Sequence, residues 1–362
     1  MPFKRRAHAV RLEFSETSLT TTNLSGVALY GDWMWVVGDE SASVERLHRL
    51  PPVGRELLRY GESASFALAD VLDLPGGADD EADLEGMALS NGWLWLVGSH
   101  GLKRKNAKAD KGDARNTRRL GRMALDSNRR LLARIPIETG ADGQPRPVRK
   151  AADGRCALRL HGDSQRNALT KLLQEDDLLA PFLTIPGKDN GFDIEGLAVD
   201  GPRLVLGLRG PVLRGWAMLL EVAVVADGDW LQLAPLDDSG TLLRKHLLQL
   251  DGFGVRDLTI DGAALLILAG PTMVLDGDVR LYRWPAARQA LAQEGEPTRF
   301  HDGIEAHTEL PHSKGHDRAE AIARLPPGLL GKLPGWLVLY DSPSQERHPQ
   351  PLVVFGDVLT GT

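Results

Sequence analysis

Short apolar segments of about five to seven residues recur along the chain in pairs separated by polar residues. A small or acidic residue stands at or beside the start of the first member of each pair. The second member is rich in Val, Leu, Ile or Trp. The five pairs occupy residues 24–29 and 33–38, 84–89 and 93–98, 194–199 and 203–208, 256–260 and 264–270, and 319–323 and 336–341. Their length and residue content predict β-strands rather than helices.

The residues between the members of a pair have the composition of tight hairpin turns. Gly31, Asn91, Gly92, Gly201 and Gly262 stand at these positions. Such residues tolerate the positive φ angles that short hairpin turns require. Each pair is therefore predicted to be an antiparallel hairpin, and five similar hairpins along one chain predict a repeat architecture.

The spacing of the hairpins predicts an all-β fold, a β-propeller. Counted from the acidic or small residue near the start of each first strand, the repeats begin at Ser25, Glu85, Glu195, Asp257 and Glu320. Most intervals are close to about 60 residues, which is enough for a blade of four strands with long loops. The interval from Glu85 to Glu195 is longer, and we expect it to hold an inserted loop and helix over residues 139–186. Hidden strands in this insertion would make six blades instead of five.

Further apolar segments complete the expected blades, which form a single domain over residues 1–362. Additional strands are predicted at 43–50 and 66–72 in the first blade, 120–125 and 131–137 in the second, 217–225 and within 242–250 in the third, and 352–355 in the last. Residues 9–14 can then form the outer strand of the last blade, so that both ends of the chain close the ring. Closure protects the strand edges that an open array would expose.

Composition narrows the class of protein without identifying it. The 362 residues carry a formal net charge of −6 at pH 7, which is too small to require a strongly charged partner. The single cysteine, Cys156, excludes an intramolecular disulfide framework and a Cys-rich zinc site. The first residues show no apolar signal segment, and no apolar run reaches the length of a membrane span. We therefore expect a cytoplasmic protein without a membrane partner.

Several short motifs carry a resemblance to a known family. They are Asp83-Leu84-Glu85-Gly86-Met87-Ala88, Gly98-Ser99-His100, Asp193-Ile194-Glu195-Gly196-Leu197, Leu208-Arg209-Gly210-Pro211, Val255-Arg256-Asp257-Leu258 and Arg318-Ala319-Glu320-Ala321-Ile322. In these motifs, which span most of the chain, it resembles DUF3616, a bacterial family of uncharacterised proteins. The resemblance implies a fold rather than a reaction. More distantly, the repeated strand start is similar to that of esterase-like phytase and gluconolactonase-type propellers, and a shared fold does not fix a function.

The predicted geometry gathers acidic residues at one mouth of the central channel. In a propeller the first strand of each blade lines the channel, and the second runs antiparallel to it. The start of the first strand and the end of the second therefore share a face. The acids expected there from the first strands are Glu85, Glu195, Asp257 and Glu320, and the second strands add Asp39, Glu40 and Asp341. Converging carboxylates need a cation, a proton or arginine partners, and Ca²⁺ prefers such oxygen ligands.

Two other residues are candidates for the same site. Arg209 ends a second strand, and its planar guanidinium suits a carboxylate or phosphate. A salt bridge between blades is the alternative role for Arg209. His100 can be a general base, a metal ligand or an ordinary hydrogen-bonded residue.

A basic run over residues 103–122 contains nine Lys and Arg residues and two Asp residues. It is predicted to form a mobile, solvated loop that can contact phosphate. No aromatic residue lies within it, which argues against nucleic acid as a partner, because single strands bind by stacking on aromatic side chains.

Our leading hypothesis from the sequence is a metal-assisted hydrolase of a small anionic ester, lactone or phosphate. The acids Glu85, Glu195, Asp257 and Glu320 would bind a divalent ion such as Ca²⁺, while Arg209 holds the anion and His100 assists catalysis. The alternative is a non-enzymatic scaffold that binds a protein or peptide at the channel mouth. In that case the four acids are structural and accept backbone N–H bonds or pair with arginine.

Overall fold

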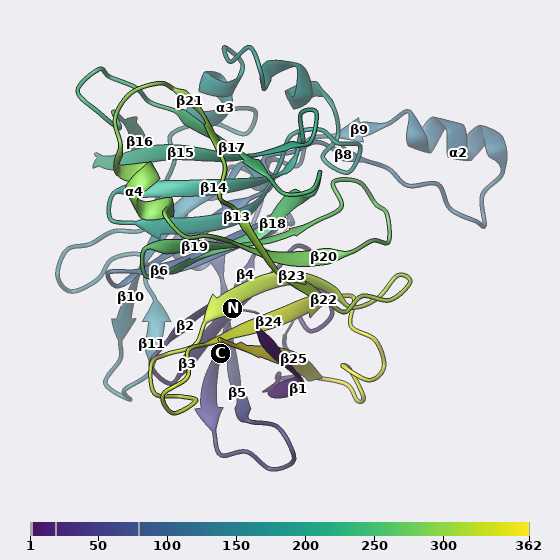
Figure 1. Cartoon of the computed structure of the whole chain (residues 1–362), viewed down its shortest axis with the longest axis vertical. Coiled ribbons are helices and arrows are strands. Elements are labelled where there is room, and N and C mark those ends of the chain that lie inside the picture. Colours follow the sequence, from purple (N-terminus) through teal and green to yellow (C-terminus); the bar gives the residue numbers. More distant parts are fainter. Residues whose placement is uncertain (1–2, 19, 79, 362) are drawn as a thin grey trace.

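The computed structural model describes residues 3–18, 20–78 and 80–361, and it is mostly β-structure with a propeller-like arrangement (Figure 1). Within these residues, five antiparallel units, here called blades, follow one another along the chain. Their inner strands are β2 (Leu24–Tyr30), β6 (Leu84–Ser90), β13 (Asp193–Asp200), β18 (Gly254–Asp261) and β23 (Arg318–Arg324). Each inner strand contacts the inner strands of both neighbouring blades, so the blades form a ring. The predicted hairpins are confirmed, because each inner strand pairs antiparallel with the next strand of the chain.

The outer strands complete each blade in chain order. The first blade adds β3 (Trp33–Gly38), β4 (Ser43–Leu50) and β5 (Leu58–Ala67). The second adds β7 (Trp93–Gly98), β10 (Leu132–Thr139), β11 (Pro145–Pro147) and β12 (Leu158–Arg159). The third adds β14 (Arg203–Gly210), β15 (Trp216–Asp227), β16 (Trp230–Ala234) and β17 (Arg244–Gln249). The fourth adds β19 (Ala264–Gly270), β20 (Val279–Trp284) and β22 (Glu305–Leu310), and the last adds β24 (Gly335–Asp341), β25 (Val353–Thr360) and β1 (Lys4–Glu13).

Two predicted outer strands are wrong. Residues 66–72 are not a strand, because β5 ends at Ala67 and is followed by the short helix α1 (Leu68–Val71), which buries Leu68 between the first two blades. Residues 120–125 lie outside the second blade. There, β9 (Met123–Ala124) pairs with β8 (Lys103–Arg104) at the base of a projection. A short apolar run is compatible with a helical turn as well as with a strand, so apolar content alone does not determine the secondary structure of these two segments.

The ring closes as predicted, since β1 pairs antiparallel with β25 and brings the two ends of the chain together (Figure 1). On its other edge, β1 pairs in parallel with β5 of the first blade. A second parallel pair joins β17 of the third blade to β21 (Thr298–His301), which belongs to a connection of the fourth blade. Two of the five boundaries between blades are therefore crossed by paired strands.

A separate hydrophobic core fills each space between neighbouring blades. Trp35 lies in the core between the first and second blades, and Trp95 lies in the core between the second and third. The inserted segment contributes to the second of these cores through α3 (Ala168–Leu173), which buries Leu169 and Leu173. None of the helices in the described part of the chain has the length and apolar character needed to cross a membrane.

Candidate functional site

A β-bulge recurs near the start of every inner strand, where the register against the second strand shifts by one residue. The residue added by each bulge is, in chain order, Ser25, Glu85, Glu195, Arg256 and Glu320. A bulge re-aims the side chain of its extra residue. The last four of these residues line one pocket at the mouth of the channel.

The bulge also explains where Asp257 lies. Its neighbour Arg256 is the extra residue, so Asp257 stands one position later, where Gly86 and Gly196 stand in other blades. Its carboxylate accepts hydrogen bonds from the backbone N–H groups of Leu258, at 2.7 Å, and Ile322, at 2.8 Å. The structure therefore places Asp257 between two inner strands, outside the pocket.

The pocket at the channel mouth, here called the mouth pocket, receives side chains from all five blades and from Lys188, just after the inserted segment. Its charged lining residues are Asp39, Glu85, Lys188, Glu195, Arg209, Arg256, Arg318, Glu320 and Asp341. Of the residues selected from the sequence, Glu85, Glu195, Glu320 and Arg209 are thus brought together, and Asp39 and Asp341 join them as expected.

Arginines neutralise one side of the mouth pocket. Glu195 Oε1 lies 2.6 Å from Arg209 Nη1, and its Oε2 lies 3.0 Å from Arg256 Nη1. Burial raises the pKa of Glu195, but the positive charges of Arg209 and Arg256 outweigh it and hold the pKa below its usual value. Arg256 Nη1 also lies 2.8 Å from Glu320 Oε1. For Glu320 the effect of burial is larger than that of the Arg256 charge, and the pKa of Glu320 is raised to about 7.

Three carboxylates lie close together, and two of them, Asp39 and Glu85, line the mouth pocket. Asp39, Asp83 and Glu85 each place an oxygen within 4.8 Å of the other two, and we call this group the acidic triad. Asp83 pairs with Arg129 at 2.7 Å. Burial, followed by repulsion from Glu320 and Asp83, raises the pKa of Asp39 to about 8. Burial and the charge of Asp83 likewise raise the pKa of Glu85 well above its usual value.

Two oxygens of the acidic triad accept no hydrogen bond within the described residues, and one of them, Asp83 Oδ2, is still ion-paired with Arg129. Asp39 Oδ1 is buried and makes no hydrogen bond within residues 3–18, 20–78 and 80–361. A buried polar atom without a partner is costly and is rare in native proteins. A divalent cation bound by the three carboxylates would satisfy this atom and the charge of the group, so the acidic triad can hold a metal ion.

Two cations face the mouth pocket without a close carboxylate. Desolvation lowers the pKa of the Lys188 ammonium, but the charges of Glu85, Glu320 and Asp39 together outweigh it and keep the pKa above its usual value. No described residue forms an ion pair with Lys188. Arg318 lies 3.9 Å from Asp341 and 4.0 Å from Asp276, which is the outer limit of an ion pair. Both groups are available to an anion that enters the pocket.

Comparison with known proteins identifies the family. The model of the family described as "Protein of unknown function (DUF3616)" matches residues 23–357. The chain belongs to DUF3616. No curated protein matches this DUF3616 chain.

Solved structures resemble this DUF3616 chain only distantly. Glutaminyl cyclase of Myxococcus xanthus is 10% identical, with a TM-score of 0.41 and all of both chains covered. The α-L-arabinofuranosidase of Podospora anserina is 9% identical, with a TM-score of 0.40 and coverage of 100% of this chain and 97% of that one. The periplasmic gluconolactonase of Pseudomonas aeruginosa is 14% identical, with a TM-score of 0.33 and coverage of 93% and 84%.

His100 lies outside the mouth pocket of this DUF3616 chain. Its Nδ1 donates to the carbonyl of Gly98 at 2.9 Å, and its Nε2 accepts from the side-chain amide of Asn167 at 2.8 Å. Burial lowers the pKa of His100 to about 4. Asn167 caps α3, so the imidazole connects the end of β7 to the inserted helix.

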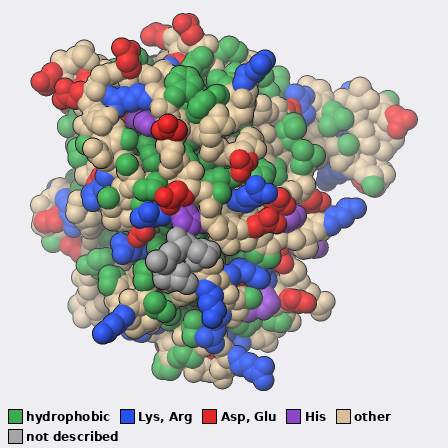
Figure 2. All heavy atoms as spheres, in the orientation of Figure 1, with side chains coloured by type: hydrophobic (Ala, Val, Ile, Leu, Met, Phe, Trp, Pro, Cys, Tyr) green, Lys and Arg blue, Asp and Glu red, His purple; other side chains and the backbone are tan. Residues whose placement is uncertain are grey.

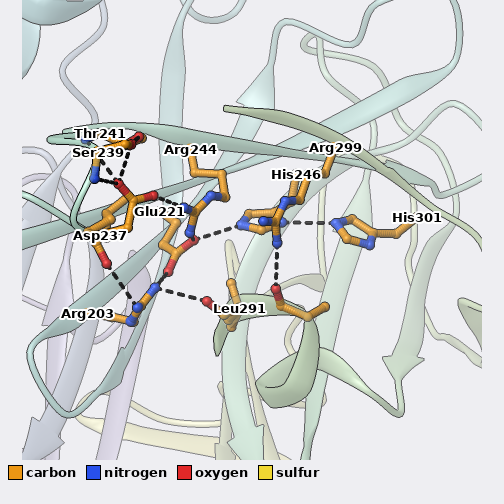
Figure 3. Close-up of polar contacts among 12 residues, drawn as sticks. Arg203, Glu221, Asp237, Ser239, Thr241, Arg244, His246, Leu291, Arg299 and His301 are labelled. Atoms are coloured by element: carbon orange, nitrogen blue, oxygen red, sulfur yellow. Dashed lines mark hydrogen bonds and ion pairs between the residues drawn. The ribbon is translucent and has the colours of Figure 1, made fainter. Parts of the chain in front are cut away.

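A second group of buried charges lies in the third blade, away from the mouth pocket (Figure 3). Glu221 pairs with Arg203 and, at 3.1 Å, with Arg244, and its Oε2 accepts from His246 Nε2 at 3.1 Å. The other ring nitrogen of His246 lies 2.9 Å from His301 Nε2. The group shares no residue with the mouth pocket, and its place between β15, β17 and β21 indicates that it joins these strands.

Sequence reasoning missed two charged residues of the site. Asp83 stands two positions before Glu85, as Asp193 stands two positions before Glu195. This repeated acid was a signal that could have found Asp83. Lys188 lies between the inserted segment and β13, in a connection that has no counterpart in the other blades, so the repeat gave no indication of it.

Proposed function

We propose that the chain is a five-bladed β-propeller that binds a divalent cation at the acidic triad and uses it to hydrolyse a small anionic ester, lactone or phosphate. The observation that carries the proposal is the buried, unpartnered Oδ1 of Asp39 beside Asp83 and Glu85. Without a cation, burial and the neighbouring carboxylates raise the pKa of Asp39 to about 8 and raise that of Glu85, so the charged forms of these two side chains are disfavoured. A cation favours the charged forms and gains three carboxylate ligands.

The cation site proposed here differs from the one predicted from the sequence, because it does not use all four of the predicted acids. Glu195 is already neutralised by Arg209 and Arg256, and Asp257 is bonded to backbone N–H groups. Neither needs a metal ion. Glu85 is the one member of the original four that belongs to the acidic triad.

An anionic substrate is supported by the positive charges around the pocket. Lys188 and Arg318, which line the same pocket as Asp39 and Glu85, can hold an oxyanion group. A bound cation would polarise the scissile group or activate water. Lys188 would neutralise negative charge that develops on the substrate. Glu195, bound to Arg209 and Arg256, would keep the side chains around it fixed.

A basic projection stands next to the mouth pocket and supports the same substrate class. It includes β8, β9 and α2 (Asp113–Leu120) and extends from the body of the molecule (Figures 1 and 2). The predicted solvated loop is thus partly regular, although α2 has no buried residue. Nine basic and two acidic residues over 103–122 give a charge of +7 (9 − 2) in a chain of net charge −6. Such a field attracts anions and raises their association rate.

The test is calorimetric titration of chelator-treated protein with Ca²⁺, Mg²⁺, Mn²⁺ and Zn²⁺. We expect one of these ions to bind the wild-type protein and to release protons on binding, and Asp39→Asn and Glu85→Gln to lose that binding. Asp341→Asn is the matched control, since it removes a carboxylate of the same pocket outside the acidic triad and should leave binding intact. Hydrolysis of lactones and phosphate esters should follow cation binding across these variants. A wild-type protein that binds none of the four ions would refute the proposal.

A further inference from the structure

An exposed apolar segment forms part of the mouth pocket. Met273, Val274 and Leu275, which follow β19, line it together with the charged residues. Their relative exposures are 43%, 58% and 60%. Three consecutive large apolar side chains on a surface, beside a charged pocket, are typical of a binding surface rather than of ordinary scatter. We call residues 273–275 the apolar rim.

The apolar rim is held in place by the pocket itself. Arg209 Nε donates to the carbonyl of Thr272 at 3.0 Å, and its Nη2 donates to the carbonyl of Met273 at 3.3 Å. Met273 also forms a β-bridge with Asp189, next to Lys188. The same guanidinium binds Glu195, so the apolar rim and the charged wall are parts of one arrangement. The backbone of the rim is therefore fixed while its side chains stay exposed.

We infer that the ligand of the mouth pocket is a small amphiphile, with an oxyanion bound by Lys188 and Arg318 and a short aliphatic chain that covers the apolar rim. The inference rests on the proposed function for the identity of the site. The charged groups select an anion. Each methylene of the aliphatic chain that covers the apolar rim adds favourable binding free energy. A purely polar anion would leave the rim exposed to water, and a purely apolar ligand would leave the two cations without a partner.

The experiment compares ligands that differ only in chain length. Ethyl, butyl and hexyl phosphate are titrated into the protein in the presence of saturating Ca²⁺, or of whichever ion binds, with butyrate and hexanoate as a second head group. We expect the dissociation constant to fall by about two- to fourfold for each added methylene. The phosphate and carboxylate series identify the preferred oxyanion.

The variant that tests the apolar rim is Met273→Ser/Val274→Ser/Leu275→Ser. It should bind ethyl phosphate as the wild type does and lose the preference for hexyl phosphate, while cation affinity stays unchanged and reports correct folding. Val225→Ser/Leu333→Ser removes exposed apolar side chains elsewhere and should keep the preference. Equal binding of all chain lengths by the wild type, or no binding of any of these anions, would overturn the inference even if the cation binds. Failure of the cation to bind would instead remove the proposed function.

Discussion

Glu195 and Asp39 line the same pocket but differ in what surrounds their carboxylates. Glu195 lies between two arginines, which keep it charged although it is buried. Asp39 has neighbouring carboxylates, and its ionised form is disfavoured up to about pH 8. Substitution of the two residues by their amides should therefore have opposite effects on stability.

Glu195→Gln should lower the free energy of unfolding by about 3–5 kcal/mol, because it leaves the buried guanidinium of Arg209 without its charged partner and leaves Arg256 with Glu320 alone. The loss should be the same with calcium and with chelator. Asp39→Asn is the matched control. The raised pKa of Asp39 makes its ionised form costly to the folded protein above the ordinary carboxyl pKa, so removing the charge should not destabilise the apo protein at pH 8. Urea unfolding of the three proteins measures both effects, and equal stability of Glu195→Gln and wild type would contradict the ion-pair role.

The inner strands show which parts of the site a sequence can indicate. Apolar runs and turn residues located all five hairpins, because a strand buried on both faces must be apolar and its turn must accept positive φ. The one-residue bulge is not visible in that pattern. In the fourth blade, Asp257 lies in the sequence position of a marker acid, but the bulge gives the pocket position to Arg256. Predicting this exchange requires the register, which depends on packing between blades.

The charged group of the third blade should make stability depend on pH. Burial lowers the pKa of His301 to about 4 and also lowers that of His246, although Glu221 opposes the second shift. In the unfolded chain both residues titrate near about 6.5. Between these values the unfolded state binds protons that the folded state does not, so the free energy of unfolding should fall as the pH is lowered from about 6.5 towards 4.

Urea unfolding at pH 7, 6 and 5 measures this dependence. His301→Gln should reduce its slope by up to about 1.4 kcal/mol per pH unit. His312→Gln, at an exposed histidine of the connection after β22, serves as the control and should keep the wild-type slope. An unchanged slope in His301→Gln would show that another group causes the dependence.

At the scale of the whole molecule, the ring and its closure by β1 followed from counting hairpins, since an array of sheets must protect its edges. The outer strands were less predictable, because they are shorter, partly exposed and interrupted by helices such as α1. The inserted segment could be recognised by its length alone. The contact of its Asn167 with His100, and the place of the following Lys188 in the mouth pocket, depend on tertiary contacts that no local pattern records.

The two parallel pairs that cross blade boundaries divide the ring into unequal cooperative units. The pair β1–β5 makes the first and last blades one continuous sheet, and the pair β17–β21 links the third blade to the fourth. Within the described residues, the second blade is joined to the third only by a single parallel bridge, Leu160–Leu231, and shares no longer strand pair with either neighbour. It should therefore open first under native conditions, and its amides in β6, β7 and β10 should exchange with deuterium at a lower opening free energy than those of the other inner hairpins. The acidic triad spans the boundary between the first and second blades, so a bound cation should slow that exchange. Uniform exchange in all five blades, unaffected by cations, would show that the ring opens as a single unit.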